Sequence, residues 1–379
     1  MESYLVGGAV RDRLLELPVY DRDWVVVGAS EAEMLAAGYQ RAAADFPVFI
    51  HPETGEEYAL ARTEEKVGPG YKGFRIYAGT DVTLEQDLLR RDLTINALAM
   101  DAEGRLIDVC KGREDLAEGL LRHITPAFVE DPVRLLRIAR FAAKLGQWGF
   151  RVAHGTQGLM RKMAAGDDLR ALTQERVFQE LWKAMGETQP WRFFEVLQDC
   201  GALQRLLPEL SSVMGTQESH QSVREDGGMT ALKRVAKLSD DPGVRFAVLM
   251  YLAAQQAEDV DRFIAGLRVE KQTRVKLKDL LELAPLVENG PQPGQSLQII
   301  KQLKPETQPQ RFNAFVLAAH ALWPGHAVEI ENRLQIACEV VESIDVSALR
   351  AQGLEGRALG AALLERQLAE MNEKLAGIS

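Results

Sequence analysis

The sequence predicts an α+β domain followed by a longer all-helical region. Up to about residue 110, short β-rich runs alternate with short helical runs, which is typical of an α+β unit. From Asp131 onward, apolar residues recur at spacings of three and four and the β-rich runs fade, which indicates helices. Because 379 residues are long for a single hydrophobic core, we expect two to four structural units.

The elements of the first region are expected in a definite order. A strand over residues 4–6 runs into Gly7 and Gly8, and further strands are expected over residues 24–27, 48–50, 58–61 and 106–109. A helix is expected to begin with Asp131 as its cap and Pro132 as its first residue. Later stretches rich in Gly, Pro, Ser and Gln mark candidate boundaries at residues 215–230, 289–296 and 304–310.

The composition is that of an ordinary globular protein. Hydrophobic residues make up 46% of the chain, no apolar run reaches the roughly 18 residues of a membrane span, and the N-terminus lacks the features of a signal peptide. We therefore expect a cytoplasmic protein with no membrane partner. Cys110, Cys200 and Cys338 lie far apart without metal-ligand spacing, so neither a disulfide framework nor a zinc site is indicated.

The charge is distributed unevenly. A net charge of −10 argues against a general polyanion binder, because Lys and Arg make phosphate contacts. Between Asp131 and Arg176, however, nine Lys or Arg residues stand against four acidic residues. This basic island (residues 131–176) indicates a local anion-binding surface, although solvated helix faces give the same pattern.

The most informative motif is Gly7-Gly8 followed by Asp21-Arg22-Asp23. Glycines let the backbone approach a phosphate group. If Asp21 and Asp23 share a strand, both carboxylates lie on one face, about 6–7 Å apart, and are placed to hold Mg²⁺ together with water or phosphate oxygens. The motif predicts a nucleotidyl-transfer site, whereas Asp-x-Asp by itself is most often a solvated turn.

Two further clusters carry groups suited to a nucleotide. In residues 90–97, Arg91 is able to fork onto phosphate oxygens while Asp92 and Asn96 take ribose hydroxyls. The alternative is a charged helix start capped by Asp92. In residues 56–63, Glu57 supplies another carboxylate from a neighbouring strand, and the alternative is a solvated strand end.

The third cluster, residues 130–141, carries a base-reading pair and a fan of arginines. Arg134, Arg137 and Arg140 step by about 300° each, so they present successive forks to an elongated anion such as a nucleotide. Asp131 accepts and Arg134 donates hydrogen bonds, which suits the Watson–Crick edge of cytosine and adenine but not that of guanine and uracil. As plain structure, the same residues are a helix start.

Together these clusters closely resemble the motifs of the class II tRNA nucleotidyltransferases, the bacterial CCA-adding enzymes. Gly-Gly-Ala-Val-Arg-Asp with Asp-Arg-Asp-Trp is similar to their first motif, Arg-Arg-Asp-Leu-Thr-Ile-Asn-Ala to their second, and Glu-Asp-Pro-Val-Arg-Leu-Leu-Arg to their nucleotide-selecting motif. The resemblance spans at least residues 4–145. Asp108, Gly112 and Asp115 fit the hinge motif, and residues 172–177 fit the helical neck.

The resemblance implies a polymerase-β-like nucleotidyltransferase head over residues 1–140, a helical neck that binds nucleotide and RNA over residues 141–212, and a helical body and tail over residues 213–379. It implies that Asp21 and Asp23 hold Mg²⁺, with Glu57 as a third catalytic carboxylate, and that Asp131 and Arg134 read the base. The remaining nucleotide-binding residues that it implies are Gly8, Arg11, Arg91, Asp92, Asn96, Arg137 and Arg140.

The implied reaction is in-line attack of the tRNA 3′-hydroxyl on the α-phosphorus of CTP or ATP, which releases pyrophosphate and builds C-C-A without a nucleic-acid template. The implied partners are tRNA, CTP and ATP, and the implied state is a monomer or homodimer. Two alternatives stay open. A bacterial poly(A) polymerase shares the head and its motifs, and a non-catalytic RNA-binding protein of the same fold is argued against by the presence of both Asp21 and Asp23.

One stretch departs from some members of the family. Some bacterial members carry a C-terminal His-Asp metal phosphohydrolase domain, and the corresponding stretch here, Val244 to Leu252, is apolar or aromatic where the His-Asp pair would stand. None of the six histidines of the chain has Asp beside it. We therefore expect residues 213–379 to be degenerate relative to that domain, with the hydrolase absent or inactive.

Overall fold

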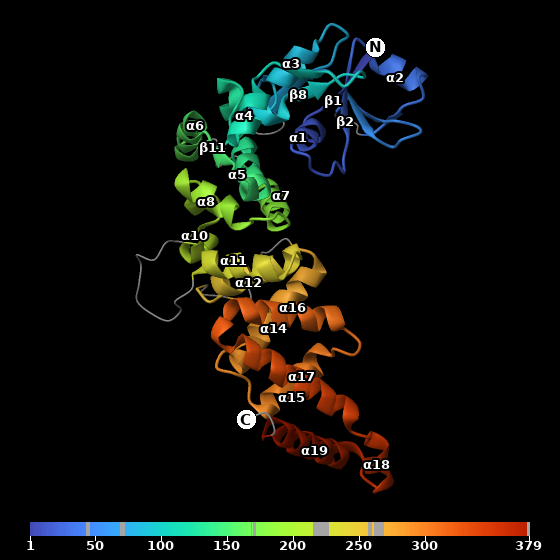
Figure 1. Ribbon diagram of the computed structural model, residues 1–379, viewed down its shortest axis with the longest axis vertical. Helices are drawn as coiled ribbons and strands as arrows, with labels where there is room; N and C mark the ends of the chain where they lie inside the picture. Colours follow the sequence, from blue (N-terminus) through green and yellow to red (C-terminus); the bar gives the residue numbers. More distant parts are fainter. Residues whose placement is uncertain are drawn as a thin grey trace. The chain divides into compact units, whose positions relative to one another are not determined.

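The computed structural model describes the whole chain except residues 43–45, 69–72, 168, 170–171, 215–226, 257–259, 261–268 and 377–379 (Figure 1). The chain forms two compact units, Met1–Leu207 and Pro208–Ser379. Within the described residues the first unit is α+β and the second is helical, which confirms the predicted fold class. The candidate boundary at residues 215–230 lies mostly outside the described residues.

A seven-stranded sheet forms the centre of the first unit. Its strands, in order across the sheet, are β3 (Gln40–Arg41), β4 (Val48–Ile50), β5 (Glu57–Leu60), β2 (Asp23–Val27), β1 (Glu2–Val6), β8 (Leu98–Met100) and β9 (Leu106–Asp108). The five predicted strands are all present, with ends within two residues of those expected. Strands β3 and β8 were not predicted, because β3 is only two residues long and Leu-Ala-Met in β8 lacks β-branched and aromatic residues.

Two short pairs of strands lie outside this sheet. Strands β6 (Thr63–Lys66) and β7 (Phe74–Tyr77) are antiparallel, and β10 (Leu120–Leu121) and β11 (Arg151–Val152) are parallel.

Apolar side chains on both faces of the sheet form its core. Val25 and Val26 are consecutive in β2 and point to opposite faces. Val25 packs in a cluster with Leu88 of α3 (Leu84–Leu89), and Val26 packs in another with Met34 of α2 (Glu31–Ala36). The two helices therefore cover different faces of the sheet.

The strand register brings the motif residues to one end of the sheet. Asp23, the first residue of β2, pairs with Val6 of antiparallel β1 and with Glu57 of parallel β5. Directly after Val6 the chain turns at Gly7, with φ 68°, into α1 (Gly8–Leu14). Glycine suits this turn because it adopts positive φ without steric cost. Asp21 lies two residues before β2, so the two aspartates do not share the strand as expected.

The predicted hinge residues make structural contacts between the sheet and the helices. The carboxylate of Asp108 accepts hydrogen bonds from three backbone N–H groups, of which that of Gly112 is 2.9 Å away, at the start of α4 (Gly112–Glu118). A Cβ atom at Gly112 would lie 2.3 Å from the carbonyl oxygen of Thr94, so this approach requires glycine. Buried Asp115 accepts a hydrogen bond of 2.6 Å from the Thr94 hydroxyl.

Helix α5 (Val133–Leu145) is central to the helices of the first unit. It packs against α7 (Gln174–Met185) and α8 (Trp191–Asp199), and α6 (His154–Ala165) and α9 (Leu203–Leu206) complete this group. The helix begins one residue later than expected, with Pro132 as its cap. The division expected after residue 140 falls inside α5, because its buried apolar positions continue to Leu145.

The second unit is built around a fully buried helix, α12 (Pro242–Ala254), in which every residue from Gly243 to Ala254 is buried. It contacts α10, α11, α14 and α16. The helices around and beyond it are α10 (Pro208–Met214), α11 (Gly228–Leu238), α14 (Lys271–Val287), α15 (Pro293–Leu303), α16 (Pro309–Leu322), α17 (Ala327–Ser343), α18 (Val346–Ala351) and α19 (Gly356–Ala376). The candidate boundaries at residues 289–296 and 304–310 coincide with the ends and starts of α14, α15 and α16, where Pro opens two helices.

Among the described residues, none of the helices combines the length and the apolar character that crossing a bilayer requires.

Candidate active site

The turn at Gly7 is in close contact with an arginine. A Cβ atom at Gly7 would lie 2.9 Å from Nη1 of Arg91, closer than side-chain carbons approach. The same nitrogen donates to the carbonyl oxygen of Asn96 at 3.4 Å, and the Gly7 N–H donates to Leu98 O at 3.0 Å. Glycine therefore serves two purposes here, since it allows the positive φ and the approach of a guanidinium to the backbone.

Three exposed carboxylates lie near this turn. Asp23 and Glu57 are register partners on neighbouring strands, and Asp21 precedes them on the chain. Neighbouring protein atoms exclude water from part of the Asp23 carboxylate, and this desolvation raises its pKa. The positive charge of Arg91 opposes the increase, and the negative charge of Asp21 adds to it. Within the described residues no three His, Cys, Asp or Glu side chains converge as a metal cluster. Asp21, Asp23 and Glu57 therefore do not form a preassembled cluster of three ligands.

The neighbouring Glu56 is occupied by other groups. Its carboxylate accepts a hydrogen bond of 2.8 Å from the Trp24 indole N–H and lies 3.4 Å from Nη1 of Arg22. Trp24 also stacks on Tyr58, with ring centroids 5.4 Å apart. Of the two consecutive glutamates, Glu57 is therefore the one that lies beside Asp23 with its side chain exposed.

A chain of buried polar contacts runs from α1 to α5 through residues 92–96. Arg11 Nη1 donates to Asn96 Oδ1 at 2.6 Å, Asn96 Nδ2 donates to Asp92 Oδ1 at 3.2 Å, and Arg137 Nε donates to Asp92 Oδ2 at 2.6 Å. Burial by itself would raise the pKa of Asp92, but Arg137 and the hydrogen bonds from Asn96 and Leu93 outweigh it and lower the pKa to about 2. Asp92 is therefore an ionised, fully partnered carboxylate and not a solvated helix cap.

Arg11 is more enclosed than a free phosphate ligand would be. Its side chain is 3% exposed, and its Nε and Nη2 lie 2.8 and 2.7 Å from Asp12 Oδ1. Asp12 also accepts a hydrogen bond from Lys144 of α5 at 3.0 Å. A nucleotide that bound Arg11 directly would have to replace these contacts.

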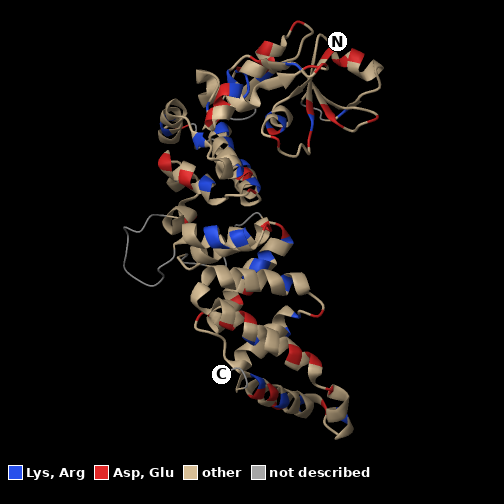
Figure 2. Ribbon diagram, viewed as in Figure 1, with Lys and Arg blue, Asp and Glu red and all other residues tan. Residues whose placement is uncertain are grey.

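Three of the predicted nucleotide-binding arginines lie close to the ring of Phe141. The guanidinium carbons of Arg140, Arg11 and Arg137 lie 4.6, 5.2 and 5.9 Å from its centroid. A π-face attracts such cations and limits their mutual repulsion. Two members of the predicted fan, Arg137 and Arg140, therefore lie at one ring together with Arg11 of α1, whereas the third, Arg134, donates to the Arg90 carbonyl oxygen. Figure 2 shows Lys and Arg recurring along α5.

The predicted base-reading pair is directed to other partners in this structure. The two carboxylate oxygens of Asp131 lie 3.2 and 3.3 Å from Nη1 and Nη2 of Arg176 on α7. Arg134 instead donates to the carbonyl oxygen of Arg90 at 2.9 Å. Asp131 and Arg134 thus each have a partner from another part of the chain.

Several charged residues of this site were not predicted from the sequence. Arg176 pairs with Asp131, Glu180 accepts from Arg140 Nε at 2.7 Å, and buried Asp87 lies between Arg90 and Arg91. Glu180 is 6% exposed on the apolar face of α7. A glutamate at a buried position of the helical pattern was the available signal for a cationic partner.

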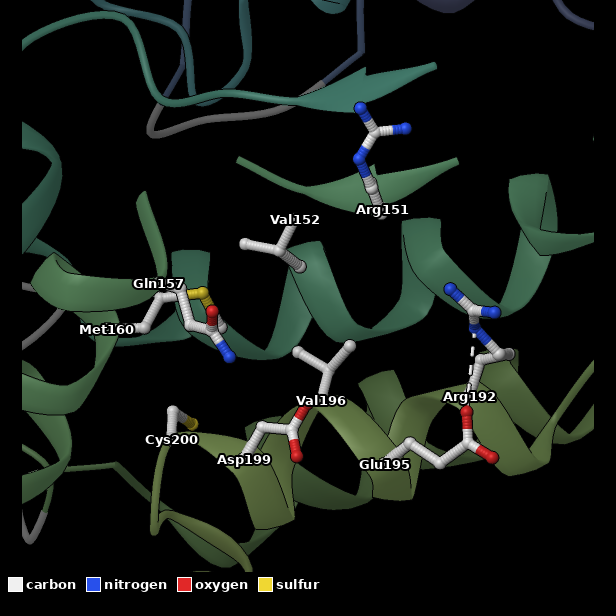
Figure 3. A pocket seen from close by; sticks show the side chains of 9 residues that line it. All are labelled: Arg151, Val152, Gln157, Met160, Arg192, Glu195, Val196, Asp199 and Cys200. Atoms are coloured by element: carbon white, nitrogen blue, oxygen red, sulfur yellow. Dashed lines mark ion pairs between the residues drawn. The ribbon is translucent and has the colours of Figure 1, made fainter. Parts of the chain in front are cut away.

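The described residues also line a cavity away from this site. It has a volume of about 230 Å³ and lies between β11, α6 and α8 (Figure 3). Its lining residues are Arg151, Val152, Gln157, Met160, Arg192, Glu195, Val196, Asp199 and Cys200. None of the predicted catalytic or nucleotide-binding residues belongs to it.

Comparison with known proteins gives this geometry a context. Residues 3–122 match the family described as "Poly A polymerase head domain", and residues 149–214 match "Probable RNA and SrmB-binding site of polymerase A". The multifunctional CCA proteins of Thioalkalivibrio sulfidiphilus and Pseudomonas paraeruginosa are each 44% identical to the chain, over 404 and 401 residues, covering 98% of this chain and 98% of each relative.

Solved structures share the fold. The Bacillus stearothermophilus CCA-adding enzyme in complex with CTP superposes with a TM-score of 0.67 at 22% identity, covering 98% of this chain and 89% of that one. A tRNA-processing enzyme with CTP superposes with a TM-score of 0.68 at 21% identity, covering 98% and 97%. At these identities the likeness concerns the fold alone.

Proposed function

The chain belongs to the family of the multifunctional CCA proteins, and we propose that it adds or repairs the 3′-terminal CCA of tRNA from CTP and ATP in the cytoplasm, without a nucleic-acid template. The observation that carries the proposal is the meeting of Asp23 and Glu57 with the Gly7 turn and Arg91 at one end of the sheet. Carboxylates that hold a metal and an arginine beside an open backbone turn are the parts that nucleotidyl transfer requires.

In the transfer step the 3′-hydroxyl of the tRNA releases its proton to solvent and its oxygen forms a bond to the α-phosphorus, while the bond from that phosphorus to the bridging oxygen breaks and pyrophosphate leaves. Asp21 and Asp23 would hold Mg²⁺, with Glu57 as a further carboxylate; when bound, Mg²⁺ stabilises charge on the attacking and leaving oxygens. The pairing of Asp23 with Glu57 supports this assignment, because it places two carboxylates side by side at the end of the sheet.

The arginines and their partners would bind the rest of the nucleotide. Arg91 lies against the Gly7 turn, where with Gly8 it would meet the triphosphate. Asp92 and Asn96 are hydrogen-bonded to each other, and Asp92 also contacts Arg137. In the proposed site, the ribose hydroxyls would hydrogen-bond to Asp92 and Asn96. Arg11 and Arg140 add positive charge around Phe141 and complete the proposed nucleotide site.

Base selection is proposed to use Asp131 and Arg134 after their present partners are exchanged for the base. Arg176 holds Asp131, and the Arg90 carbonyl holds Arg134. Cytosine and adenine each present an exocyclic amine and a ring nitrogen to such an acceptor–donor pair. A base with the opposite order would leave both groups unpaired at about 1–3 kcal/mol each, which supports rejection of G and U.

One incubation tests the proposal. Purified protein is mixed with tRNA that lacks C-C-A and with each nucleotide separately, and products are resolved at single-nucleotide length. We expect two additions with CTP and one more after ATP follows. Growth of an A homopolymer with ATP alone would indicate a poly(A) polymerase, and tRNA binding without any incorporation would indicate a non-catalytic RNA-binding protein.

The second unit is proposed to lack the His-Asp phosphohydrolase activity. In α12, Tyr251 is 3% exposed and its ring lies 5.8 Å from that of Trp323, edge to face, while Leu252 is 9% exposed. Apolar packing thus fills the position where a His-Asp pair would bind metals. Purified full-length protein should release no product from 2′,3′-cyclic AMP with Mn²⁺, Co²⁺ or Ni²⁺, and metal-stimulated hydrolysis would contradict the proposal.

A further inference from the structure

Asp87 is a buried carboxylate that no part of the proposed mechanism has used so far. It lies on α3 and its side chain is 0% exposed. Its two oxygens are divided between consecutive arginines. Oδ1 accepts from Nε and Nη2 of Arg90 at 3.0 and 2.7 Å, and Oδ2 accepts from Nη2 and Nε of Arg91 at 3.1 and 3.4 Å.

The contact with Asp87 determines which edge of Arg91 is free. Because Nε and Nη2 of Arg91 face Asp87, Nη1 projects toward the Gly7 turn, where it lies 2.9 Å from the position of a Cβ atom. Asp23 pairs with Val6, the residue directly before this turn. Asp87 thus holds a guanidinium against the glycine turn, which adjoins the strand pair that carries the proposed catalytic carboxylate.

Asp87 also allows several cations to be packed together. Burial lowers the pKa of Arg62 and of Arg91, and the nearby positive charge of Arg90 lowers each of them further. The negative charge of Asp87 raises the pKa of both arginines. The pKa of Asp87 itself is lowered, because Arg90 and Arg91 outweigh the effect of its burial. The carboxylate is therefore ionised at neutral pH, and its loss would leave Nε and Nη2 of Arg91 without the carboxylate that they contact.

We propose that Asp87 is a positioning residue for nucleotide binding, which fixes Arg91 so that its Nη1 edge faces the triphosphate beside Gly7. This inference rests on the proposed function, because it takes that site to bind CTP and ATP. Asp87 does not touch the nucleotide itself; it acts through Arg91.

Glu64 provides a matched control within the same network. It lies 2.9 Å from Nη1 of Arg90 and 3.2 Å from Nε of Arg62, and its side chain is 19% exposed. No contact joins it to Arg91 among the hydrogen bonds and ion pairs of the described residues. Glu64→Gln therefore disturbs the arginine cluster without releasing Arg91.

The test compares D87N, R91K and D87N/R91K with E64Q and the unchanged protein. For each protein we measure the KM for CTP and for ATP, kcat, inhibition by pyrophosphate and binding of tRNA. We expect D87N to raise both KM values and the pyrophosphate inhibition constant about tenfold, with kcat and tRNA binding within about threefold of the unchanged protein. E64Q should stay within about twofold throughout.

The double variant separates positioning from general stability. If Asp87 acts through Arg91, the KM values and the pyrophosphate inhibition constant of D87N/R91K should be no higher than those of R91K alone, because both changes disrupt the same contact between Asp87 and Arg91. Additive losses, or a fall in tRNA binding and kcat with unchanged KM, would overturn the proposal. If D87N does not fold, D87E replaces it, because this change keeps the charge and moves it by one methylene. We expect the same increases in KM and in the pyrophosphate inhibition constant for D87E. Values equal to those of the unchanged protein would overturn the proposal. Failure of the unchanged protein to incorporate CTP would contradict the proposed function instead.

Discussion

Replacing Asp92 with Asn should remove a stabilisation that depends on pH. The folded protein lowers the pKa of Asp92 from its ordinary value of 3.8 to about 2. Each pKa unit corresponds to about 1.4 kcal/mol, and the 37% exposure of Arg137 admits water that screens part of the attraction, so we expect a loss of about 2 kcal/mol at pH 7. Since the folded pKa lies below the unfolded one, this stabilisation is present above about pH 4 and is lost as the pH falls toward 2.

Urea unfolding followed by tryptophan fluorescence is a suitable assay for D92N. Four of the five tryptophans (Trp24, Trp148, Trp182 and Trp191) belong to the first unit, so the signal reports mainly on the unit that contains Asp92. The difference in free energy of unfolding between D92N and the unchanged protein should be about 2 kcal/mol at pH 7 and should shrink at pH 3.

Glu65→Gln serves as the control for this measurement. Glu65 pairs with Arg75 at 3.7 Å, and both side chains are more than 70% exposed, so its loss should change the stability by less than about 0.5 kcal/mol. A D92N effect that is the same at pH 7 and pH 3, or no larger than that of E65Q, would refute the assignment of Asp92 as a buried ionised partner of Arg137.

Three further predictions concern the reaction. D21A and D23A should each lower CTP incorporation by at least a hundredfold while tRNA binding in a filter assay stays within about threefold, because the carboxylates are proposed to hold the metal and not the RNA; survival of activity in both would contradict the metal assignment. R134A should lower the preference for CTP and ATP over UTP and GTP about tenfold in kcat/KM, whereas unchanged discrimination would exclude Arg134 from base reading. G7A should raise the KM for both nucleotides several-fold, because the added methyl group displaces Arg91 at a turn with positive φ; an unaltered KM would show that the close approach is dispensable.

The sheet of the first unit was predictable because its signals are local. The β-branched residues of β2 alternate between two faces, and the two glycines after β1 mark where the strand must end. The capping boxes of Ser30 with Glu33 and of Thr83 with Gln86 begin α2 and α3 in the same local way. Strand order was not predictable from these signals, because the parallel pairing of β2 with β5 brings together residues more than thirty positions apart.

Side-chain partners in the candidate site were less predictable for the same reason. Arg11 has a partner one residue away, Asp12, and another at Asn96, 85 positions along the chain. Spacing along one helix predicted that Arg137 and Arg140 would present successive forks to an elongated anion. Instead, each meets a carboxylate from another part of the chain, and both guanidinium carbons lie within 6 Å of the centroid of the Phe141 ring. The local sequence pattern predicts on which helix or strand each charged residue lies. The packing of elements that are distant in sequence decides which of these charged groups remain available to a ligand.

The base-reading pair shows what this difference means for selection. Asp131 and Arg134 are three residues apart, and their spacing favours a joint hydrogen-bonding edge, but Asp131 pairs with Arg176 of α7 and Arg134 with the Arg90 carbonyl oxygen. A base that binds both groups must replace those two contacts, so part of the free energy of base binding goes into the exchange. Only a base that pairs with both the Asp131 carboxylate and the Arg134 guanidinium recovers this free energy, because a mismatched base leaves both groups without partners after the exchange. Because every base must displace the same two partners, the exchange weakens the binding of all bases by a similar amount. Under the proposed role, discrimination therefore depends on which base pairs with both groups afterwards.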